Sequence, residues 1–435
     1  MTARRLLVLA ESAHPQAQSV SWIGWALSRA LAARNEVHLV TRKANREAIL
    51  AAGLVEGRDF TAIDIEGLEQ RLLRVAARLR GGEDKGWTTL MALSLPIYYA
   101  FEREVWRQFG ERIRERRFDL VHRVTPMSPT MPSLMAGRCA RAGTPFVLGP
   151  INGGLPWPRE FPHLRAAERE WLSSLRELHR LVPYYRSTRR SAAAIVAGSL
   201  ATLDQVPAGF RAKSFYIPEN AIDPARFPPS PERRYGLPVQ ALFIGRLVPY
   251  KGCDMAIEAA APALRDGRLE LTIVGDGPER PRLEALAASE GVRSRVHFLG
   301  RVAPAQVHAH YALSDLLLFP SVREFGGGVV LEAMAMGVVP LVVDYGGPGE
   351  LVVPGAGLKV PLVERPAMVA ALREALEGVI AAPEVLRPLA EAARKRIERL
   401  FTWERKAEQL GEIHDWVLGE RAERPEFGFL EAQRR

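Results

Sequence analysis

Two glutamates and a run of three glycines lie within residues 320–337, in an arrangement that suits a phosphorylated and hydroxylated ligand. Glu324 precedes the glycines at 326–328, and Glu332 follows them inside an apolar stretch. We expect a helix to begin near Val329, which places Glu332 about one turn inside it. The glycines leave room for a phosphate at the amino end of that helix. A carboxylate among apolar neighbours needs a partner, and either ribose hydroxyls or an internal arginine would supply one.

Two cations follow a strand that we expect over residues 241–247. Arg246 and Lys251 flank a turn leading into a helix, and a helix start with two added positive charges suits a diphosphate. Such a pair is also typical of solvated surface charges. Gly275 ends the next expected strand and lets backbone approach a ligand, although a tight turn needs the same residue. Arg280 occupies the place of a third small residue, which excludes the dinucleotide-binding fingerprint.

These residues need strand ends to position them, because ligands of open α/β sheets bind beyond the carboxyl ends of the strands. The 435 residues exceed a single core of ordinary size. Short β-branched runs alternate with amphipathic segments in two series, which predicts two Rossmann-like, doubly wound parallel-sheet α/β domains facing a cleft. The first-series strands are expected at residues 5–11, 36–41, 61–65, 118–124, 145–149, 193–197 and 213–217. The second-series strands are expected at residues 241–247, 269–275, 296–300, 315–320, 339–343 and 357–360.

Composition also predicts the domain boundaries. Residues 227–238 are rich in proline and charge, as is typical of a linker. We therefore predict an N-terminal domain over residues 1–226 and a C-terminal domain over residues 239–402. A closing helix is expected over residues 403–418, followed by a loosely ordered tail over residues 419–435.

Two long helical stretches, at about residues 69–117 and 165–190, interrupt the first series, and the first is broken at Gly81 and Gly82. Both combine Trp, Tyr and Leu with many Arg residues. We interpret them as surface helices packed on the first domain, because charge runs usually mark solvated faces. The alternative is a basic, aromatic face that rests on an anionic membrane surface.

The charge and cysteine content limit the partners and the compartment. A net charge of +9 suits anionic partners such as nucleotide sugars or lipid phosphates. No nucleic-acid-binding motif appears, so nucleic acid is not an expected partner. The only two cysteines, Cys139 and Cys253, lie in different halves, which favours a reducing, cytoplasmic location. The longest apolar run, residues 90–101, is shorter than a bilayer span and contains Pro96.

Residues 324–332 resemble the E-x7-E motif of the family 4 retaining glycosyltransferases, which belong to glycosyltransferase group 1. Residues 245–252 resemble that family's G-R-L-x-x-x-K-G phosphate-binding turn. Further segments that resemble the family are residues 217–227, 273–278 and 401–403. The likeness is continuous from about residue 192 to residue 418, and its motifs are specific jointly and weak singly.

The resemblance implies a GT-B fold and an enzyme of the hexosyltransferase kind. Such an enzyme transfers a sugar, with retention, from a UDP- or GDP-sugar to a saccharide or lipid-linked acceptor in cell-envelope or exopolysaccharide biosynthesis. The implied donor-binding residues are Arg246, Lys251, Gly275, Gly327, Gly328 and Glu332. Arg246 and Lys251 would also assist catalysis at the diphosphate, while Glu324 would contact sugar hydroxyls near the anomeric carbon.

No Asp-x-Asp pair, which metal-dependent enzymes use to hold a cation, occurs in the sequence. Departure of a diphosphate needs positive charge, and Arg246 with Lys251 could replace a metal ion in that role. We therefore expect neither a metal nor a cofactor, with the nucleotide-diphosphate sugar as the donor substrate.

The first domain departs from the family pattern. The usual glycine-rich loop after the first strand is replaced by residues 11–24, in which Gly24 alone cannot serve fully. The position at which the family's active-site histidine is frequent is Val124, so His122 is the remaining catalytic candidate, with a core histidine as the alternative. His14 is a second candidate. The glycine loop at residues 150–154 either faces the ligand across the cleft or forms a plain turn.

Three other functions fit parts of the sequence. A nucleotide-sugar epimerase or an inverting transferase would share the two-domain architecture. A non-catalytic nucleotide-sugar-binding subunit of an envelope-assembly complex would explain the departures in the first domain. Nucleic-acid binding rests on the net charge alone. A peripheral position on the inner face of the membrane stays open as an addition to the cytoplasmic location.

Overall fold

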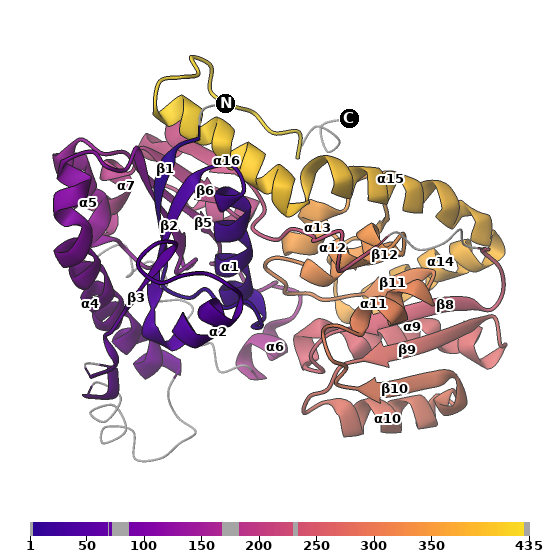
Figure 1. The fold of residues 1–435 in the computed structure, drawn as a ribbon. Helices are drawn as coiled ribbons and strands as arrows, with labels where there is room; N and C mark the ends of the chain where they lie inside the picture. Colours follow the sequence, from indigo (N-terminus) through magenta and orange to yellow (C-terminus); the bar gives the residue numbers. More distant parts are fainter. Residues whose placement is uncertain (1–2, 68, 72–86, 168–181, 229–233, 430–435) are drawn as a thin grey trace.

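The computed structural model describes residues 3–67, 69–71, 87–167, 182–228 and 234–429, arranged in two lobes (Figure 1). The strands of the first lobe are β1 (Arg5–Ala10), β2 (Glu36–Arg42), β3 (Phe60–Ile63), β4 (Leu120–Thr125), β5 (Phe146–Ile151), β6 (Ala194–Ala197) and β7 (Ser214–Tyr216). Its described helices are α1 (Ser19–Ala32), α2 (Arg46–Ala51), α4 (Trp87–Arg114), α5 (Leu134–Ala142), α6 (Pro162–Ala167), α7 (Tyr185–Ser191) and α8 (Leu200–Asp204). The sheet is parallel throughout, in the order β3-β2-β1-β4-β5-β6-β7.

Alternate residues of the first sheet enter two different cores. In β1, Leu6 and Val8 pack with apolar residues of α1, whereas Leu7 and Leu9 pack with those of α4 and α5. Such fully buried strands read as continuous apolar runs, which is why the sequence signals them clearly. Helices therefore cover both faces, and the strand ends remain available for a site.

The second lobe repeats this plan. Its strands are β8 (Val239–Ile244), β9 (Leu269–Val274), β10 (Val296–Gly300), β11 (Leu316–Phe319), β12 (Val339–Val343) and β13 (Leu358–Val360), in the parallel order β10-β9-β8-β11-β12-β13. Its helices are α9 (Cys253–Arg265), α10 (Arg280–Ser289), α11 (Val307–Ala312), α12 (Gly328–Ala335), α13 (Gly346–Leu351), α14 (Arg365–Ala381) and α15 (Leu386–Leu400). The predicted fold class, two doubly wound parallel-sheet domains, is confirmed.

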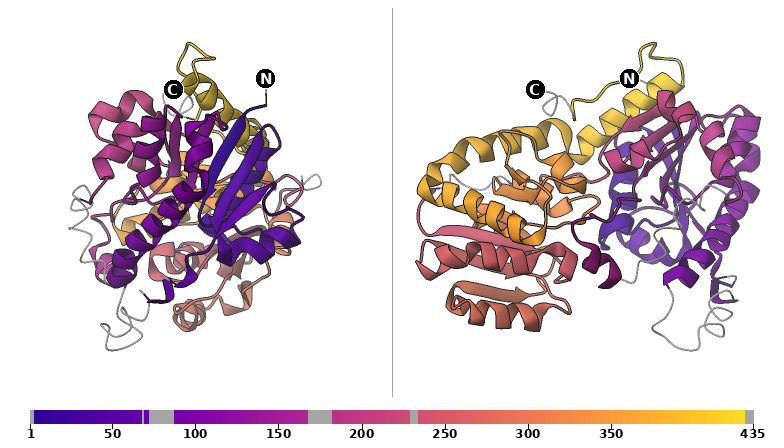
Figure 2. Two further views of the ribbon diagram at one scale, coloured as in Figure 1. Left: turned by 60° about the vertical axis from the view of Figure 1, so that its left-hand side comes forward. Right: turned by 180° about the vertical axis from the view of Figure 1, so that it is seen from behind.

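The last helix, α16 (Trp403–Val417), leaves the second lobe and packs against α1 of the first (Figures 1 and 2). Two backbone bonds mark the crossing: the Ile222 amide donates to the Phe401 carbonyl at 2.7 Å, and the Trp403 amide donates to the Ile222 carbonyl at 3.2 Å. Two chain segments therefore connect the lobes side by side, which restricts how the lobes move relative to one another.

One expectation from the sequence is wrong in part, and another falls partly outside the described residues. The loosely ordered tail is wrong for residues 419–429, because the Phe429 side chain is buried and its carbonyl accepts from Arg396 at 3.0 Å. The helix predicted from residue 69 is described at residues 69–71 and again from Trp87 in α4, and much of the stretch at 165–190 lies outside the described residues. None of the described helices is long and apolar enough to cross a membrane.

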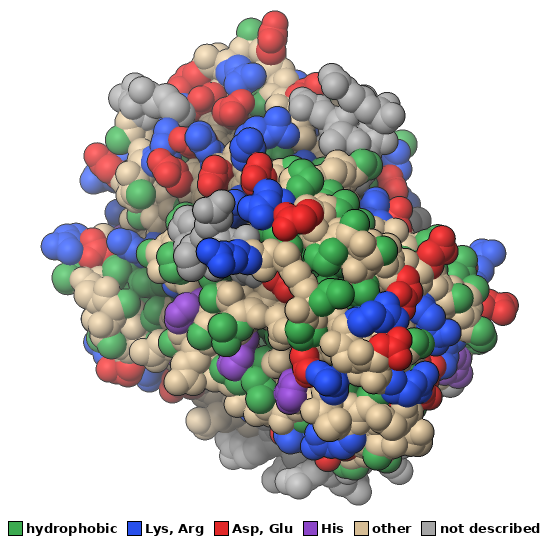
Figure 3. Space-filling model, turned by 90° about the vertical axis from the view of Figure 1, so that its right-hand side faces the viewer, with side chains coloured by type: hydrophobic (Ala, Val, Ile, Leu, Met, Phe, Trp, Pro, Cys, Tyr) green, Lys and Arg blue, Asp and Glu red, His purple; other side chains and the backbone are tan. Residues whose placement is uncertain are grey.

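Positive charge is not gathered on the outer face of the second lobe. Figure 3 shows acidic and basic side chains interspersed over that face, with hydrophobic groups between them. A mixed surface of this kind is typical of a solvated domain rather than of a nucleic-acid-binding patch.

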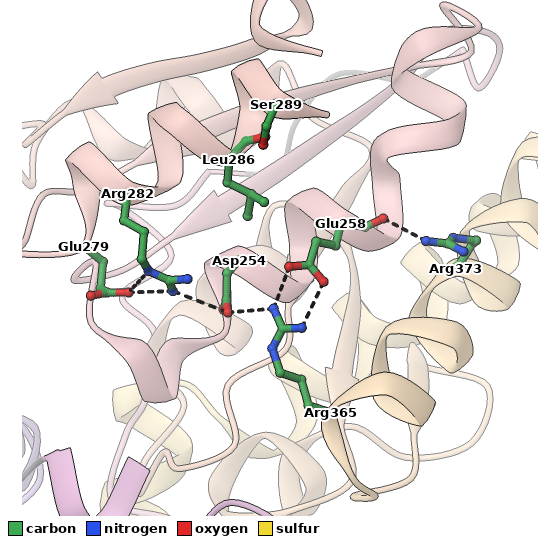
Figure 4. Close-up of polar contacts among 8 residues, drawn as sticks. All are labelled: Asp254, Glu258, Glu279, Arg282, Leu286, Ser289, Arg365 and Arg373. Atoms are coloured by element: carbon green, nitrogen blue, oxygen red, sulfur yellow. Dashed lines mark hydrogen bonds and ion pairs between the residues drawn. The ribbon is translucent and has the colours of Figure 1, made fainter. Parts of the chain in front are cut away.

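A charged network fixes the start of α9, the helix that follows Lys251 (Figure 4). The Arg365 guanidinium bridges Asp254, at 2.9 Å, and Glu258, at 2.6 Å. Arg282 of α10 reaches the same Asp254 carboxylate at 3.4 Å. One acidic first turn is thus held by arginines from α10 and α14, and negative charge there also suits the amino end of a helix.

We expect Arg365→Leu to lower the free energy of unfolding by about 1–2 kcal/mol, because it leaves Glu258 without its bidentate partner. Chemical denaturation measures the change. Arg107→Leu is the matched control, since its guanidinium is 73% exposed and its partner Glu104 lies one turn away on the same helix, so a loss of about 0.5 kcal/mol or less is expected. Equal losses in the two variants would contradict a role for the network.

Candidate functional site

The site lies where the carboxyl ends of β8, β9 and β11 meet. Lys251 closes the short helix Pro249–Lys251 after β8, and Glu324 lies on the loop after β11. The Lys251 ammonium and the Glu324 carboxylate are in direct contact, although 73 residues separate them in the sequence. Their side chains are 15% and 21% exposed, so the pair is partly shielded yet still open to a ligand.

Close backbone packing brings the two loops together. Gly252 has φ of 72°, and an added Cβ there would lie 2.3 Å from the Pro320 carbonyl oxygen. Only glycine fits that position, so the turn after β8 rests directly on the end of β11. The Lys251 ammonium also lies 5.2 Å from the Phe319 ring centroid, within the range of a cation–π contact.

Arg246 and Gly275 hold different positions at this edge. The Arg246 side chain is exposed and pairs with no carboxylate among the described residues. Gly275 has φ of 139°, and an added Cβ would lie 1.9 Å from the Gly245 carbonyl oxygen. Gly275 is therefore required by the contact between the ends of β8 and β9, whereas Arg246 is an exposed cation on the loop that leads to Lys251.

The glycine run forms the start of α12. Gly327 adopts the left-handed conformation, with φ of 58°, at the residue before the helix. An added side chain at Gly328 would meet nothing nearer than Asn220, at 4.0 Å. Space is therefore open at Gly328, whereas a Cβ added at Gly326 would lie 2.3 Å from the Asn220 side-chain nitrogen and one added at Gly327 would lie 2.9 Å from Leu351. The Gly328 side of this helix start is the side with room for an anion.

Glu332 projects from the first turns of α12, as the sequence predicts, and is partly buried. The Tyr311 hydroxyl donates to its carboxylate at 2.9 Å. Burial raises the pKa of the Glu332 carboxyl to about 7, while the bond from Tyr311 and the charge of Arg226 oppose that rise. The sequence predicted either ribose hydroxyls or an internal arginine as the partner of Glu332. In the structure the Tyr311 hydroxyl donates to this carboxylate, and Arg226 adds positive charge.

Sequence reasoning missed Tyr311 and Arg226. Tyr311 belongs to α11 and is fully buried, and nothing in its local sequence distinguishes it from a core aromatic residue. Arg226 lies in the segment that leads to the second domain, with its guanidinium 4.7 Å from the Trp22 ring of α1. The surroundings of Glu332 therefore combine residues from both domains.

His122 has a structural position. Its side chain is fully buried, Nε2 donates to the Gly149 carbonyl at 2.7 Å, and Nδ1 accepts from His414 of α16 at 3.1 Å. Burial lowers the pKa of His122 to about 4, so the imidazole is neutral at neutral pH. Both ring nitrogens are occupied inside the protein, and this geometry gives the predicted catalytic role of His122 no support.

We expect His122→Gln to lower the free energy of unfolding by about 1–3 kcal/mol, because the Gly149 carbonyl and His414 lose well-placed partners. Transfer activity per folded molecule should stay within about threefold of wild type, since the side chain does not reach the cleft. Denaturant unfolding and initial-rate assays measure the two quantities. A loss of activity of a hundredfold or more in folded protein would restore the catalytic interpretation.

The other first-domain candidates take part in loop structure. His14 is partly buried, and its Nδ1 accepts from the Gln16 amide at 3.2 Å. In the loop after β5, Asn152 donates to the Glu219 carboxylate at 2.6 Å. Burial raises the pKa of Glu219 to about 7. The glycine loop at 150–154 is therefore tied to the segment that connects the domains and is more than a plain turn.

The match to a known sequence family lies in the second domain. Residues 231–396 match the family described as glycosyl transferases group 1. The alpha-D-kanosaminyltransferase of Streptomyces kanamyceticus is 34% identical over 186 residues, which are 42% of this chain and 47% of that protein. The chain spans about half the length of the first curated relatives it matches.

Comparison with solved structures extends the likeness to both lobes. Sucrose-phosphate synthase from Thermosynechococcus elongatus has a TM-score of 0.64 at 19% identity, over 96% of this chain and 100% of that one. The Anabaena protein HepE, solved in complex with UDP, has a TM-score of 0.61 at 17% identity, over 94% and 98% of the two chains. At such identities the likeness concerns the fold. The chain therefore has the GT-B fold, and its residues 231–396 match the family model of the glycosyl transferases group 1.

Proposed function

We propose that this protein is a metal-independent, retaining glycosyltransferase that takes a sugar from a UDP- or GDP-sugar. The observation that carries the proposal is the contact between Lys251 and Glu324, on the loop that leads to the amino end of α12. A cation for the diphosphate and a carboxylate for the sugar thus lie next to each other, at the sheet edge where ligands of this architecture bind.

Each residue of the proposed site has a separate role in the reaction. On donor binding, the diphosphate competes with Glu324 for the Lys251 ammonium, and the freed carboxylate accepts hydrogen bonds from sugar hydroxyls. Lys251 and Arg246 then neutralise the charge that develops on the departing diphosphate, which is the largest electrostatic demand of the reaction. Glu332 accepts from the ribose hydroxyls and fixes the nucleotide. Retention would follow from attack on the same face of the sugar that the diphosphate leaves.

The donor and the acceptor belong to the same proposal. The UDP complex of HepE supports a uridine nucleotide as the first donor to test. A saccharide or lipid-linked acceptor, in envelope or exopolysaccharide synthesis at the inner membrane surface, is consistent with the aromatic and basic side chains of α4. There the Trp106 ring has the guanidinium of Arg114 at 5.0 Å, and that of Arg138 from the neighbouring α5 at 5.4 Å.

A calorimetric screen of UDP- and GDP-sugars tests the donor, with Glu332→Ala as the site control. We expect one nucleotide class to bind wild type and to lose about tenfold or more in affinity in the variant. Equal binding to both proteins would refute the assigned pocket. The anomer of the product then separates a retaining from an inverting transferase, and an unchanged cellular function of Glu324→Ala would favour a non-catalytic binding subunit.

A further inference from the structure

The segment 152–157, here called the interdomain loop, crosses from the first domain to the donor side of the second. We propose that Trp157 in this loop is a positioning residue, which holds the backbone that carries Lys251 and Glu324. The inference rests on the proposed function for its link to catalysis. The contacts that support it are independent of that function.

The base of the interdomain loop is fixed on α8. The Gly153 amide donates to the Thr202 hydroxyl at 3.0 Å, and the Gln205 amide group donates to the Gly154 carbonyl at 2.7 Å. Gly154 has φ of 75°, a left-handed conformation that favours glycine. The loop therefore leaves the first sheet in a defined direction.

The middle of the loop is fastened to the second domain. The Tyr345 hydroxyl donates to the Pro156 carbonyl at 2.6 Å. Leu155 is only 4% exposed, and its side chain would lie 2.8 Å from a Cβ added at Gly346. Gly346 in turn packs beneath the Glu324 carbonyl, at 2.5 Å from the same added Cβ. Leu155 of the interdomain loop therefore packs on Gly346, which in turn packs against the backbone of Glu324.

Trp157 lies between two side chains of the second domain. Its ring meets the Tyr250 ring edge to face, with centroids 6.1 Å apart and planes at 85°. The Arg323 guanidinium carbon lies 4.3 Å from the centre of the same indole. Both contacts are in the range that stabilises aromatic and cation–π pairs.

The two residues that Trp157 contacts are sequence neighbours of the proposed site residues. Tyr250 immediately precedes Lys251, and Arg323 immediately precedes Glu324. One indole from the first domain therefore packs against the residues next to both members of the pair at the proposed donor site. Small displacements of such groups strongly reduce binding and rate, so a side chain that fixes both backbones acts on the site without touching the ligand.

A double-mutant cycle with Lys251 tests this role. UDP and GDP are titrated calorimetrically into wild type, Trp157→Ala, Lys251→Ala and the double variant. We expect Trp157→Ala to weaken nucleotide binding about tenfold in wild type and less than about twofold when Lys251 is absent. Equal weakening in both backgrounds would overturn the inference, because the indole would then act independently of Lys251.

Two further substitutions separate positioning from simple packing. Trp157→Phe keeps an aromatic face for Arg323 and is expected to retain most of the affinity, whereas Trp157→Leu keeps apolar volume alone and is not. Indistinguishable affinities for these two variants would also overturn the inference. Trp106→Ala is the matched control, since Trp106 is likewise stacked by arginines but lies on α4.

Hydrogen exchange distinguishes failure of this inference from failure of the proposed function. Without any ligand, Trp157→Ala should speed amide exchange in residues 250–252 and 323–326 by about tenfold, and Trp106→Ala should leave those residues unchanged. If wild type binds no nucleotide, the proposed function fails while the exchange result still decides the role of Trp157. If nucleotide binds and Trp157→Ala alters neither binding nor exchange, the inference fails alone.

Discussion

Lys251→Ala is expected to reduce kcat/KM for the donor by about 100- to 1000-fold, the usual cost of removing one group that stabilises developing charge. The ammonium is partly shielded and lies two residues before the start of α9, so its interaction with a diphosphate is screened less than that of a surface lysine. Removing it also leaves Glu324 without its described ion-pair partner, which adds repulsion against the incoming diphosphate. Initial rates at varied donor concentration measure the loss.

Two comparisons make the Lys251 result specific. Lys359→Ala is the control, because Lys359 also pairs with a carboxylate of the second domain, Asp344 at 2.8 Å, but lies on β13. It should keep kcat/KM within about twofold of wild type. Lys251→Arg keeps the charge while changing its geometry and should recover part of the rate. Full activity in folded Lys251→Ala would mean that the diphosphate binds elsewhere.

Donor affinity is expected to rise as the pH increases from 6 to 8, and Glu332→Gln should remove this dependence. The carboxylate accepts hydrogen bonds from hydroxyls best when it is ionised, and burial holds its pKa at about 7 instead of the ordinary 4.5. At pH 6 most of the protein therefore carries the weaker-binding acid form. Calorimetric titrations at fixed ionic strength measure the dependence, and a flat wild-type profile would contradict it.

The raised pKa of Glu332 also predicts how the stability of the ligand-free protein changes with pH. Between pH 4.5 and about 7 the unfolded Glu332 has lost its proton while the folded one retains it, so stability falls as the pH rises. The full effect of a shift from 4.5 to about 7 is about 3 kcal/mol. Because the pKa values of Glu219 and Glu350 are also raised to about 7, the informative quantity is the difference between Glu332→Gln and wild type.

That difference should grow in favour of the glutamine variant as the pH increases from 5 to 8. Glu374→Gln on the exposed side of α14 provides the control, and its stability relative to wild type should not change with pH. Urea denaturation at several pH values gives both curves. A constant difference between Glu332→Gln and wild type would show that Glu332 titrates alike in the folded and unfolded states.

Local pattern predicted the strands and helices of the second domain well. Continuous apolar runs such as Leu316–Phe319 are buried on both faces, so their sequence signal depends little on distant partners. Gly327 and Gly328 mark the helix start because a left-handed residue and open space are local requirements. Glu324 and Lys251 were predicted at strand ends for the same reason, although their contact depends on the strand order.

The role of His122 could not be predicted from the local sequence. His122 on β4 reads the same whether it faces a cleft or a helix, and it is α16, nearly 300 residues later, that covers it. The tail was predicted wrongly on the same ground, since Phe429 is ordered by packing on Phe401 and Tyr216 rather than by its neighbours in sequence.

By itself, the sequence of this protein determined two parallel α/β domains and a glycine-rich helix start flanked by two acids, because each depends on side chains close together in the chain. Only the tertiary structure decided that Tyr311 serves Glu332, that His122 pairs with His414, and that Trp157 reaches across to Tyr250. Those contacts join residues from separate elements, and their geometry exists only once strand order and domain packing have brought the elements together.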